Sequence, residues 1–232
     1  MKPRVTCLML SSLDGRLGSG RSGDGAKEEI AARGRAFEAA HDELAPDAWI
    51  IGRVTGAEMS KAAAHPPAEF APPPRPYHFA TRDAGAYGII VDPSGKLHFD
   101  KPDIGGDHVV VLLGRDVPDG HLAELAGDGV SYLVSEGAEI DLGAALETLG
   151  RELNLRHVAV EGGGGVNCAF LKAGLVDEVI VVIWPSINAI TGERAIFEAG
   201  EEGLADRLKL DLTSCEAKDG VVRLRYRVSM RS

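Results

Sequence analysis

The sequence predicts an α/β protein with a mainly parallel central sheet. Two patterns carry this prediction: apolar runs of strand length alternate with segments of helical period, and the chain closes with two strand-like segments around Asp219-Gly220. The alternation is typical of strand–helix–strand units, and an Asp-Gly pair between apolar segments is a strong hairpin signal. We therefore expect a mainly parallel sheet that ends in an antiparallel hairpin.

Composition and charge limit the size of the fold and the kind of partner. The 232 residues are 44% hydrophobic, enough for the core of one large domain, so we expect a single domain over residues 1–232. The net charge of -10 repels phosphate backbones and anionic membrane surfaces, which argues against nucleic acid and membranes as partners. The three cysteines lack metal-ligand spacing and the first apolar run is short, so we expect reduced thiols and a cytoplasmic protein.

The first half of the chain is expected to alternate between strands and helices. Residues 5–10 predict a strand that ends in the polar turn 11–15, and a Gly/Ser-rich loop follows it. We expect further strands at 49–51, 77–80 and 88–91, and helices at 26–44 and about 55–64. The proline-rich stretch 65–76 is expected to be a surface loop, because proline removes amide donors.

The second half continues this alternation. We expect strands at 109–113, 131–134, 158–160 and 179–184, helices at 121–126 and 142–153, and hairpin strands at 208–215 and 221–228. Val166, Ala169, Phe170 and Ala173 recur at helical spacing after strand 158–160. An amphipathic helix therefore follows that strand, with Gly174 as its cap.

Four consecutive glycines, Gly162 to Gly165, stand between the strand at 158–160 and this helix. A helix N-terminus presents unpaired N–H groups, and glycine lets a phosphate approach the backbone closely. The alternative is a tight turn without a ligand, although four glycines cost backbone entropy that a turn does not require. No Lys-Ser/Thr follows as a Walker loop needs, and Asn167 stands where a GxGxxG fingerprint has glycine. We expect a phosphate cradle of another family.

Other polar residues carry weaker signals when taken alone. Glu161 follows the carboxyl end of an expected parallel strand, where ligands gather, but a salt-bridged surface glutamate is the alternative. Asp14 is more typical of a turn and Thr55 of a helix N-cap. Cys168 is more typical of a core residue than of a nucleophile. The seven histidines form no pair at metal-ligand spacing along the chain.

Several segments together resemble the reductase family of riboflavin biosynthesis, which has a three-layer dihydrofolate-reductase-like fold. They are SSLDGRL, IIGRVT, VDPSGKL, VEGGGGVNCAFLKAGLVDEVIVVIWP and TGERAIF, and the resemblance covers nearly the whole chain. It implies an NADPH-dependent reductase that acts on a small molecule and is commonly a homodimer. The family reduces the ribosyl group of an aminouracil phosphate to a ribityl chain.

The resemblance also implies roles for residues by their position. Substrate binding is implied for Ser12, Asp14 and Glu161, of which Asp14 and Glu161 are the candidate catalytic residues. Cofactor contacts are implied for Ser11, Gly52, Thr55, Ser94, Gly163, Gly164, Gly165, Val166 and Asn167. We expect Glu161 to position the substrate and Asp14 to move the proton that accompanies hydride transfer to C1 of the opened sugar, as imine or aldehyde.

The expected reaction type is an oxidoreduction of a CH–OH/carbonyl pair. Two alternatives stay open: a reductase of the same fold acting on another carbonyl, imine or pterin-like substrate, and a non-catalytic nucleotide-binding module. The family's Asp-Asp-Pro is replaced by Gly-Ala-Glu-Met-Ser, and its arginine before the second strand is replaced by Glu43. The choice between NADPH and NADH is also open, with Arg53, Arg82 and Arg115 as candidates for the 2′-phosphate.

Overall fold

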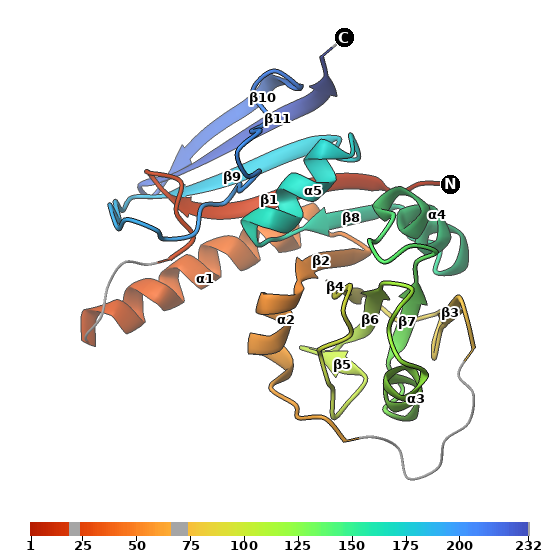
Figure 1. Cartoon of the computed structure of the whole chain (residues 1–232). Coiled ribbons are helices and arrows are strands. Elements are labelled where there is room, and N and C mark those ends of the chain that lie inside the picture. The colour runs from red at the N-terminus through yellow and green to blue at the C-terminus, as the bar shows by residue number, and fades with distance from the viewer. Residues whose placement is uncertain (19–23, 66–73, 232) are drawn as a thin grey trace. The chain divides into compact units, whose positions relative to one another are not determined.

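The computed structural model describes residues 1–18, 24–65 and 74–231, which form two compact units (Figure 1). Unit 1 comprises Met1–Pro3 and Asp47–Val158, and unit 2 comprises Arg4–Pro46 and Ala159–Ser232. Parts of the expected Gly/Ser-rich loop (19–23) and of the proline-rich stretch (66–73) lie outside the described residues. The single domain expected from the sequence stays a prediction. No helix of the described part is long and apolar enough to cross a membrane.

The sheet of unit 1 is mainly parallel. Its parallel strands pair in the order β2 (Ala48–Gly52), β4 (Tyr87–Val91), β6 (Asp107–Leu113) and β7 (Ser131–Val134). Two short strands are antiparallel: β3 (Tyr77–His78) to β7, and β5 (Asp103–Ile104) to β6. The apolar run of β6 is buried on both faces, as expected for a strand inside a parallel sheet.

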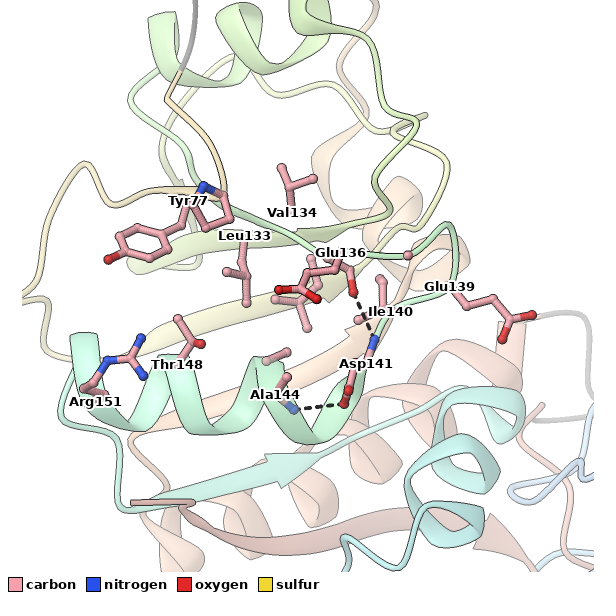
Figure 2. Close-up of a pocket in the computed structure, with 15 residues that line it drawn as sticks. Tyr77, Leu133, Val134, Glu136, Glu139, Ile140, Asp141, Ala144, Thr148 and Arg151 are labelled. Atoms are coloured by element: carbon pink, nitrogen blue, oxygen red, sulfur yellow. Dashed lines mark hydrogen bonds between the residues drawn. The ribbon is translucent and has the colours of Figure 1, made fainter.

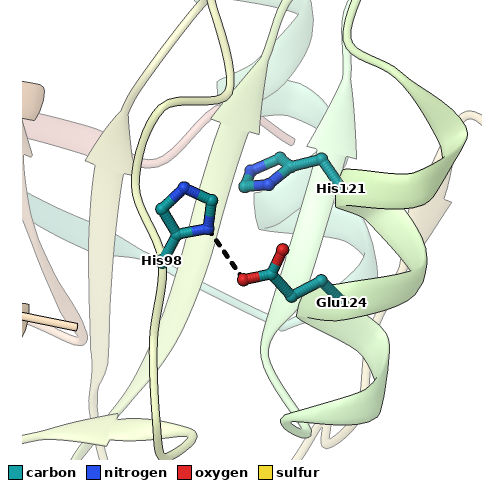
Figure 3. A group of neighbouring side chains, drawn as sticks. All are labelled: His98, His121 and Glu124. Atoms are coloured by element: carbon teal, nitrogen blue, oxygen red, sulfur yellow. Dashed lines mark hydrogen bonds and ion pairs between the residues drawn. The ribbon is translucent and has the colours of Figure 1, made fainter. Parts of the chain in front are cut away.

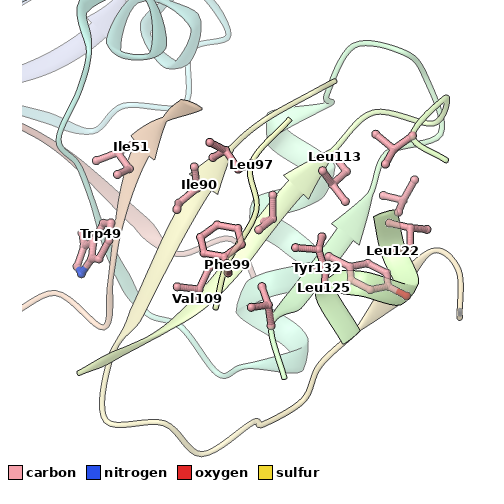
Figure 4. Close-up of a cluster of buried hydrophobic side chains, with 14 residues drawn as sticks. Trp49, Ile51, Ile90, Leu97, Phe99, Val109, Leu113, Leu122, Leu125 and Tyr132 are labelled. Atoms are coloured by element: carbon pink, nitrogen blue, oxygen red, sulfur yellow. The ribbon is translucent and has the colours of Figure 1, made fainter. Parts of the chain in front are cut away.

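Helices cover both faces of this sheet. On one face, Leu122 and Leu125 of α3 (Asp119–Gly127) pack with Val109 of β6 in a cluster of buried hydrophobic side chains (Figure 4). On the other face, α4 (Leu142–Glu152) lies near Leu112 and Leu133. The side chain of Asp141 caps α4 by accepting a hydrogen bond from the Ala144 amide at 2.9 Å.

The second helix of unit 1 differs from its expected position. Expected at about 55–64, α2 instead covers Arg53–Ser60. It ends there because Lys61 takes a left-handed conformation, with φ of 56°. A left-handed lysine at a helix end has no strong sequence signal, unlike glycine at the same position.

Unit 2 pairs strands from opposite ends of the chain. Parallel pairing joins β1 (Arg4–Ser12) to β9 (Glu178–Trp184), and antiparallel pairing joins β9 to β11 (Val221–Met230) and β11 to β10 (Leu208–Lys218). Asp219 and Gly220 both have positive φ, 52° and 80°, which is the signature of a type I′ hairpin turn. The expected hairpin is confirmed. The remaining strand, β8 (His157–Val160), crosses the division between the units.

Two helices enclose the strands of unit 2. Ala40 of α1 (Asp24–Leu44) packs with Leu8 and Ile180 on one face. Successive strand residues face opposite sides, so Cys7 faces the other way, where it interacts with Cys168 of α5 (Gly164–Lys172). This is a helix–sheet–helix arrangement, and the α/β class expected from the sequence is confirmed.

Candidate active site

Two polar turns of unit 2 lie at the carboxyl ends of parallel strands, where ligands of α/β sheets gather. One is at the end of β1, whose last residues Ser11 and Ser12 are buried, with 2% and 1% of their surface exposed, and it continues through Asp14. The other follows β8 and begins with Glu161 and the glycine run. The fold therefore gives most of the unit 2 candidates the setting that a ligand site requires.

The carboxylate of Asp14 is bound within its own unit. It accepts hydrogen bonds from the Ser12 hydroxyl at 2.6 Å, from the Asn188 amide at 3.1 Å and from the Ala189 amide at 3.0 Å. The Ser12 hydroxyl and the two amides hold the pKa of Asp14 well below its ordinary value. An ionised carboxylate with three donors connects the β1 turn to the 188–189 loop and is poorly suited to deliver a proton. These hydrogen bonds give Asp14 a positioning role, and the proton role expected for it stays a prediction.

The four glycines have different surroundings. Gly162 has a φ of 113° and precedes the cap residue Gly163; the peptide bond between them is cis. Gly164 lies so close to the main-chain oxygen of Ala195 that no β-carbon would fit. By contrast, a β-carbon on Gly163 or Gly165 would meet no atom within 4 Å among the described residues. A ligand phosphate therefore has room at Gly163 and Gly165, whereas Gly164 is glycine because the chain itself approaches it.

The segment that approaches Gly164 is residues 193–198, part of the TGERAIF motif. It is held to α5 by the Glu198 amide, which donates to the Gly164 carbonyl at 3.2 Å, and by the Asn167 side-chain amide, which donates to the Ile196 carbonyl at 2.7 Å. It is held to the β1 turn by the Ile196 amide, which donates to the Gly15 carbonyl at 3.0 Å. This segment therefore fixes the two turns of the candidate site with respect to each other.

These contacts give two of the candidate residues a structural role. Asn167 is fully buried, and its side-chain nitrogen donates to the main chain of Ile196, so it positions residues 193–198. Its expected contact with the cofactor stays a prediction. Gly164 likewise serves the packing of residues 193–198. Val166 is in the first turn of α5, where a ligand at the helix start would meet its backbone.

Glu161 forms a close pair with a histidine of α1. Its Oε1 lies 2.6 Å from Nδ1 of His41, and the Glu161 side chain is only 9% exposed. Burial raises the pKa of the nearby Cys7 thiol, and Cys168 and Glu161 raise it further, so Cys7 stays a neutral thiol. The pair of Glu161 and His41 is a set of two titratable groups that can share a proton.

Sequence reasoning missed both His41 and Arg33, a second polar residue of α1. Arg33 is 6% exposed, and its guanidinium donates to the Leu17 carbonyl at 3.2 Å. Burial lowers the pKa of Arg33. One signal was available: Arg33 falls on the same helical face as Phe37, Ala40 and Leu44, and a charge within an apolar stripe is unusual.

In unit 1, Arg53 and Ser94 both lie beside the buried carboxylate of Asp92. Gly52 is the N-cap of α2, and the next residue, Arg53, places Nε 4.0 Å from Oδ1 of Asp92. The Ser94 hydroxyl donates to the same oxygen at 3.4 Å. The other oxygen of Asp92 accepts from the amides of Lys96 and Leu97. Thr55 lies in the first turn of α2 and is half-buried.

The other two arginine candidates are engaged elsewhere in unit 1. Arg82 pairs with Glu152 at 3.5 Å and lies over the Phe79 ring. Arg115 pairs with Asp116 at 3.3 Å and donates to the Glu136 carbonyl. Among the three arginines, Arg53 is the one beside Ser94.

Unit 1 also contains a cavity of about 390 Å³ at the carboxyl ends of β6 and β7 (Figure 2). Glu136, Glu139 and Asp141 line one side, and Arg151 lies at the other end. Three carboxylates disfavour an anionic phosphate. None of Gly52, Thr55 and Ser94 lines the cavity, so it is separate from the expected cofactor residues.

The replacement of a family arginine by Glu43 has a structural counterpart in unit 2. Arg223 of β11 forms an ion pair with Glu43 and lowers the pKa of that carboxyl. An arginine at position 43 would face Arg223 and repel it. In this chain, position 43 is part of a helix-to-strand ion pair.

The sheet, the terminal hairpin and the glycine-rich start of α5 define an α/β protein of the pyrimidine reductase fold. A pyrimidine reductase-like protein of Corynebacterium diphtheriae shares this fold with a TM-score of 0.66 and 18% identity, over 98% of this chain and 92% of that one. RibD of Acinetobacter baumannii gives a TM-score of 0.61 and 24% identity, over 98% and 58%. The riboflavin biosynthesis reductase Rib7 of Saccharomyces cerevisiae gives 0.58 and 18%, over 98% and 90%.

The chain belongs to the RibD C-terminal domain family, since the sequence model of this family matches residues 3–224. The expected resemblance to riboflavin-biosynthesis pyrimidine reductases is therefore confirmed. A curated relative is the 2,5-diamino-6-ribosylamino-4(3H)-pyrimidinone 5′-phosphate reductase of Methanothermobacter thermautotrophicus, 31% identical over 104 residues. The matched segment covers 44% of this chain and 47% of that relative.

One expectation about the reaction is wrong. The reaction expected from the sequence was an oxidoreduction of a CH–OH/carbonyl pair. The curated relative is named as the reductase of a ribosylamino compound, in which the sugar carbon is bonded to nitrogen. The reductive step of such reductases is at a C=O/C–N centre, and the CH–OH/carbonyl assignment is withdrawn.

Proposed function

We propose that this protein is an NADPH-dependent reductase that converts a ribosylamino pyrimidine phosphate to its ribitylamino product. The observation that carries the proposal is the open backbone at Gly163 and Gly165, at the N-terminus of α5 and next to Glu161. NADPH, when bound, supplies a hydride. The opened sugar is attached as an imine, so hydride adds to C1, the C=N bond becomes a C–N single bond, and the nitrogen takes one proton.

The start of α5 suits the cofactor pyrophosphate. The first amides of a helix have no partners within the helix and carry a partial positive charge, which stabilises a bound phosphate. The protein has a net charge of -10, so an anionic ligand requires local donors of this kind. Gly163 and Gly165 leave space for the phosphate oxygens, which supports their expected cofactor role.

We assign the proton that reaches the imine nitrogen to the pair of Glu161 and His41. At 2.6 Å the two groups are in direct hydrogen-bond contact, and the proton of this hydrogen bond can be passed to a substrate atom, directly or through a water. Asp14 does not serve as the donor, because its three hydrogen bonds stabilise the ionised form. It positions Ser12 and the 188–189 loop beside the reacting centre.

In unit 1 we assign the 2′-phosphate of NADPH to Arg53. It lies beside Ser94 across Asp92, and its side chain is 44% exposed, so it can turn toward a ligand. A guanidinium with an exposed end binds phosphate through two parallel hydrogen bonds. Ser94 then adds a hydroxyl donor on the adenosine side, as the family resemblance implies.

The experiment uses the full chain with NADPH labelled with deuterium at C4 and the ribosylamino pyrimidinone phosphate as substrate. We expect NADPH to be oxidised and one deuterium to appear on C1 of a ribityl chain. NADPH binding without turnover on this or on related carbonyl, imine or pterin-like compounds would favour a nucleotide-binding module. Failure to bind NADPH would reject the proposal.

We also propose a homodimer. The C-terminal hairpin exposes Leu210, Leu212 and Met230, which are 50%, 56% and 48% exposed, on a strand pair that includes the edge strand β10. Apolar residues gathered on an exposed edge are typical of a contact surface. Light scattering should give twice the 24.5 kDa chain mass, and Leu212→Lys should shift it to the monomer. A monomeric wild-type protein would reject this proposal.

A further inference from the structure

Two histidines and a glutamate meet beside α3 in unit 1 (Figure 3). None of them is among the residues assigned above to the reaction. His121 and Glu124 are three residues apart on α3 and therefore lie on the same face of the helix. His98 comes from the extended segment after β4. One ligand atom from each of the three residues lies within 4.8 Å of the others.

One atom of this cluster lacks a partner. Nε2 of His121 is buried and makes no hydrogen bond among the described residues, and the residue is only 8% exposed. A buried polar atom without a partner costs roughly 1–3 kcal/mol, so such atoms are rare in folded proteins. The His121 ring lies edge-on to the His98 ring, with 5.3 Å between their centroids. The atom needs either a metal ion that accepts its lone pair or a hydrogen-bond partner.

The other two residues of the cluster, His98 and Glu124, contact each other. Nδ1 of His98 lies 2.7 Å from Oε1 of Glu124, and the same oxygen accepts from the His65 amide at 3.1 Å. Figure 3 shows the second carboxylate oxygen of Glu124 on the side of His121. The carboxylate is thus held between the two imidazoles by the backbone of a third residue.

A second group, of His65, Glu124 and Asp128, also has ligand spacing but is less suited to a metal. Both ring nitrogens of His65 already have partners, since Nδ1 lies 2.8 Å from the Ala63 carbonyl oxygen and Nε2 lies 3.0 Å from Asp128. His65 and Asp128 are therefore better placed to support Glu124 than to bind a cation. Of the two groups, the one with His98, His121 and Glu124 is therefore the better candidate for a metal site, because it contains the unpartnered nitrogen of His121.

We propose that His98, His121 and Glu124 form a binding site for a divalent transition metal of the zinc type, in which these three side chains are ligands and water completes a tetrahedron. Two imidazoles and a carboxylate are a ligand set that Zn²⁺ accepts, with bonds of about 2.0–2.2 Å. Tetrahedral geometry with such bonds separates ligand atoms by roughly 3.3 Å. The metal would replace the proton shared by His98 and Glu124, and binding would release that proton.

A metal bound at this site would stabilise the turn that contains Ser94. A β-carbon on Gly95 would lie 2.9 Å from Cδ2 of His121, so the ring packs directly against the turn at Asp92–Gly95. His98 is in the chain segment that leaves this turn. A metal bound to both histidines would join the turn to α3 and raise the stability of unit 1.

The test uses the full chain without a histidine tag, stripped with a chelator and dialysed. We expect one Zn²⁺ per chain by competition with a chromophoric chelator, and visible absorption bands of tetrahedral Co²⁺ when cobalt is added. His98→Gln and Glu124→Gln should each weaken Zn²⁺ binding by about tenfold or more and remove the cobalt bands. Zn²⁺ should raise the melting temperature of the wild type and not of these variants.

His108→Gln is the matched control, because His108 is also in unit 1 but contacts Ser131 at 2.8 Å, outside the cluster. It should bind Zn²⁺ as the wild type does. Two results overturn the proposal: a wild-type chain that takes up no Zn²⁺ or Co²⁺ at micromolar concentration, or an equal loss of binding in His108→Gln. The variant Glu124→Gln keeps the test decisive if His98→Gln fails to fold, since glutamine retains an oxygen that accepts from the His65 amide.

Discussion

The main-chain oxygen of Ala195 fills the space that a β-carbon on Gly164 would need. The glycine run therefore combines two requirements that look the same in the sequence. Gly164 admits a neighbouring segment of the chain, whereas Gly163 and Gly165 leave open space at the start of α5. Substitutions at positions 164 and 165 should consequently fail in different ways.

Gly164→Ala should destabilise the fold. Its methyl group would push residues 195–198 away from α5, and overpacking of this kind costs about 1–3 kcal/mol. Chemical denaturation should show the loss as a lower midpoint without a change in slope. A melting curve identical to that of the wild type would mean that residues 195–198 do not pack against Gly164.

Gly165→Asp should fold normally and lose NADPH. An acidic side chain in the first turn of a helix is favourable to the helix, so stability should be unchanged or slightly higher. A carboxylate about 4 Å from a phosphate charge repels it by about 4 kcal/mol at an effective dielectric constant near 20. Fluorescence titration should show this loss of affinity. Gly165→Asn, similar in shape but neutral, is the control and should bind more tightly than Gly165→Asp.

Asp14→Asn should reduce stability in a manner that depends on pH. The folded pKa of Asp14 is lowered from 3.8, so the unfolded state binds more protons just below that pH. The stabilising effect of the carboxylate is therefore fully present above about pH 4 and is lost as the pH falls through the folded pKa. Melting temperatures of the two proteins should differ at neutral pH and converge in acid. A constant difference across this range would contradict the hydrogen bonds assigned to Asp14.

His41→Phe should lower kcat more than it raises KM for NADPH. The ring keeps much of the volume packed against Glu161 but cannot share a proton with it. Steady-state kinetics over a range of pH should show a changed profile for kcat. His157→Phe changes a histidine in the other unit and is the control. Equal kcat in wild type and His41→Phe would remove His41 from the proton step.

Arg53→Gln should weaken NADPH and leave NADH almost unchanged. The guanidinium is assigned to the 2′-phosphate, which NADH lacks, so the ratio of the two values of kcat/KM should shift toward NADH. Arg82→Gln is the control, since Arg82 pairs with Glu152 and covers the Phe79 ring. A similar shift in both variants would mean that charge in general, rather than Arg53, attracts the phosphate.

The order of strands and helices could be predicted from the sequence. An element that is buried on one face repeats its apolar residues with the period of a helix or of a strand, and a strand that is buried on both faces is a short apolar run. The hairpin is the clearest case, since Asp219 and Gly220 favour positive φ by their chemistry. The end of α2 was missed because Lys61 takes a left-handed conformation that lysine does not signal. The two-residue strand β5 is too short to show any period.

The site was less accessible, because contacts between distant segments decide its details. The motif predicts a cofactor contact for Asn167, but it gives no sign that the side-chain nitrogen of this residue donates to Ile196, 29 residues further along the chain. His98 and His121 are far apart in sequence and have no metal-ligand spacing, and only the fold brings them together. A sequence pattern can indicate which turn belongs to a candidate site, but it does not show which residues of that turn are bound by other segments of the protein.

Residues 193–198 have a consequence for how the protein is made. The turn after β1 leaves the ribosome well before its partners are synthesised, since Gly15 accepts a hydrogen bond from Ile196 and β1 pairs with β9. Contacts between segments so distant in the chain are slow to form and leave apolar surface exposed while synthesis continues. A nascent chain that ends before residue 190 already contains all four glycines but lacks the segment that orders them. The two turns of the candidate site are therefore ordered only after residues 193–198 have been synthesised, and chains truncated before them should be substrates for chaperones and proteases.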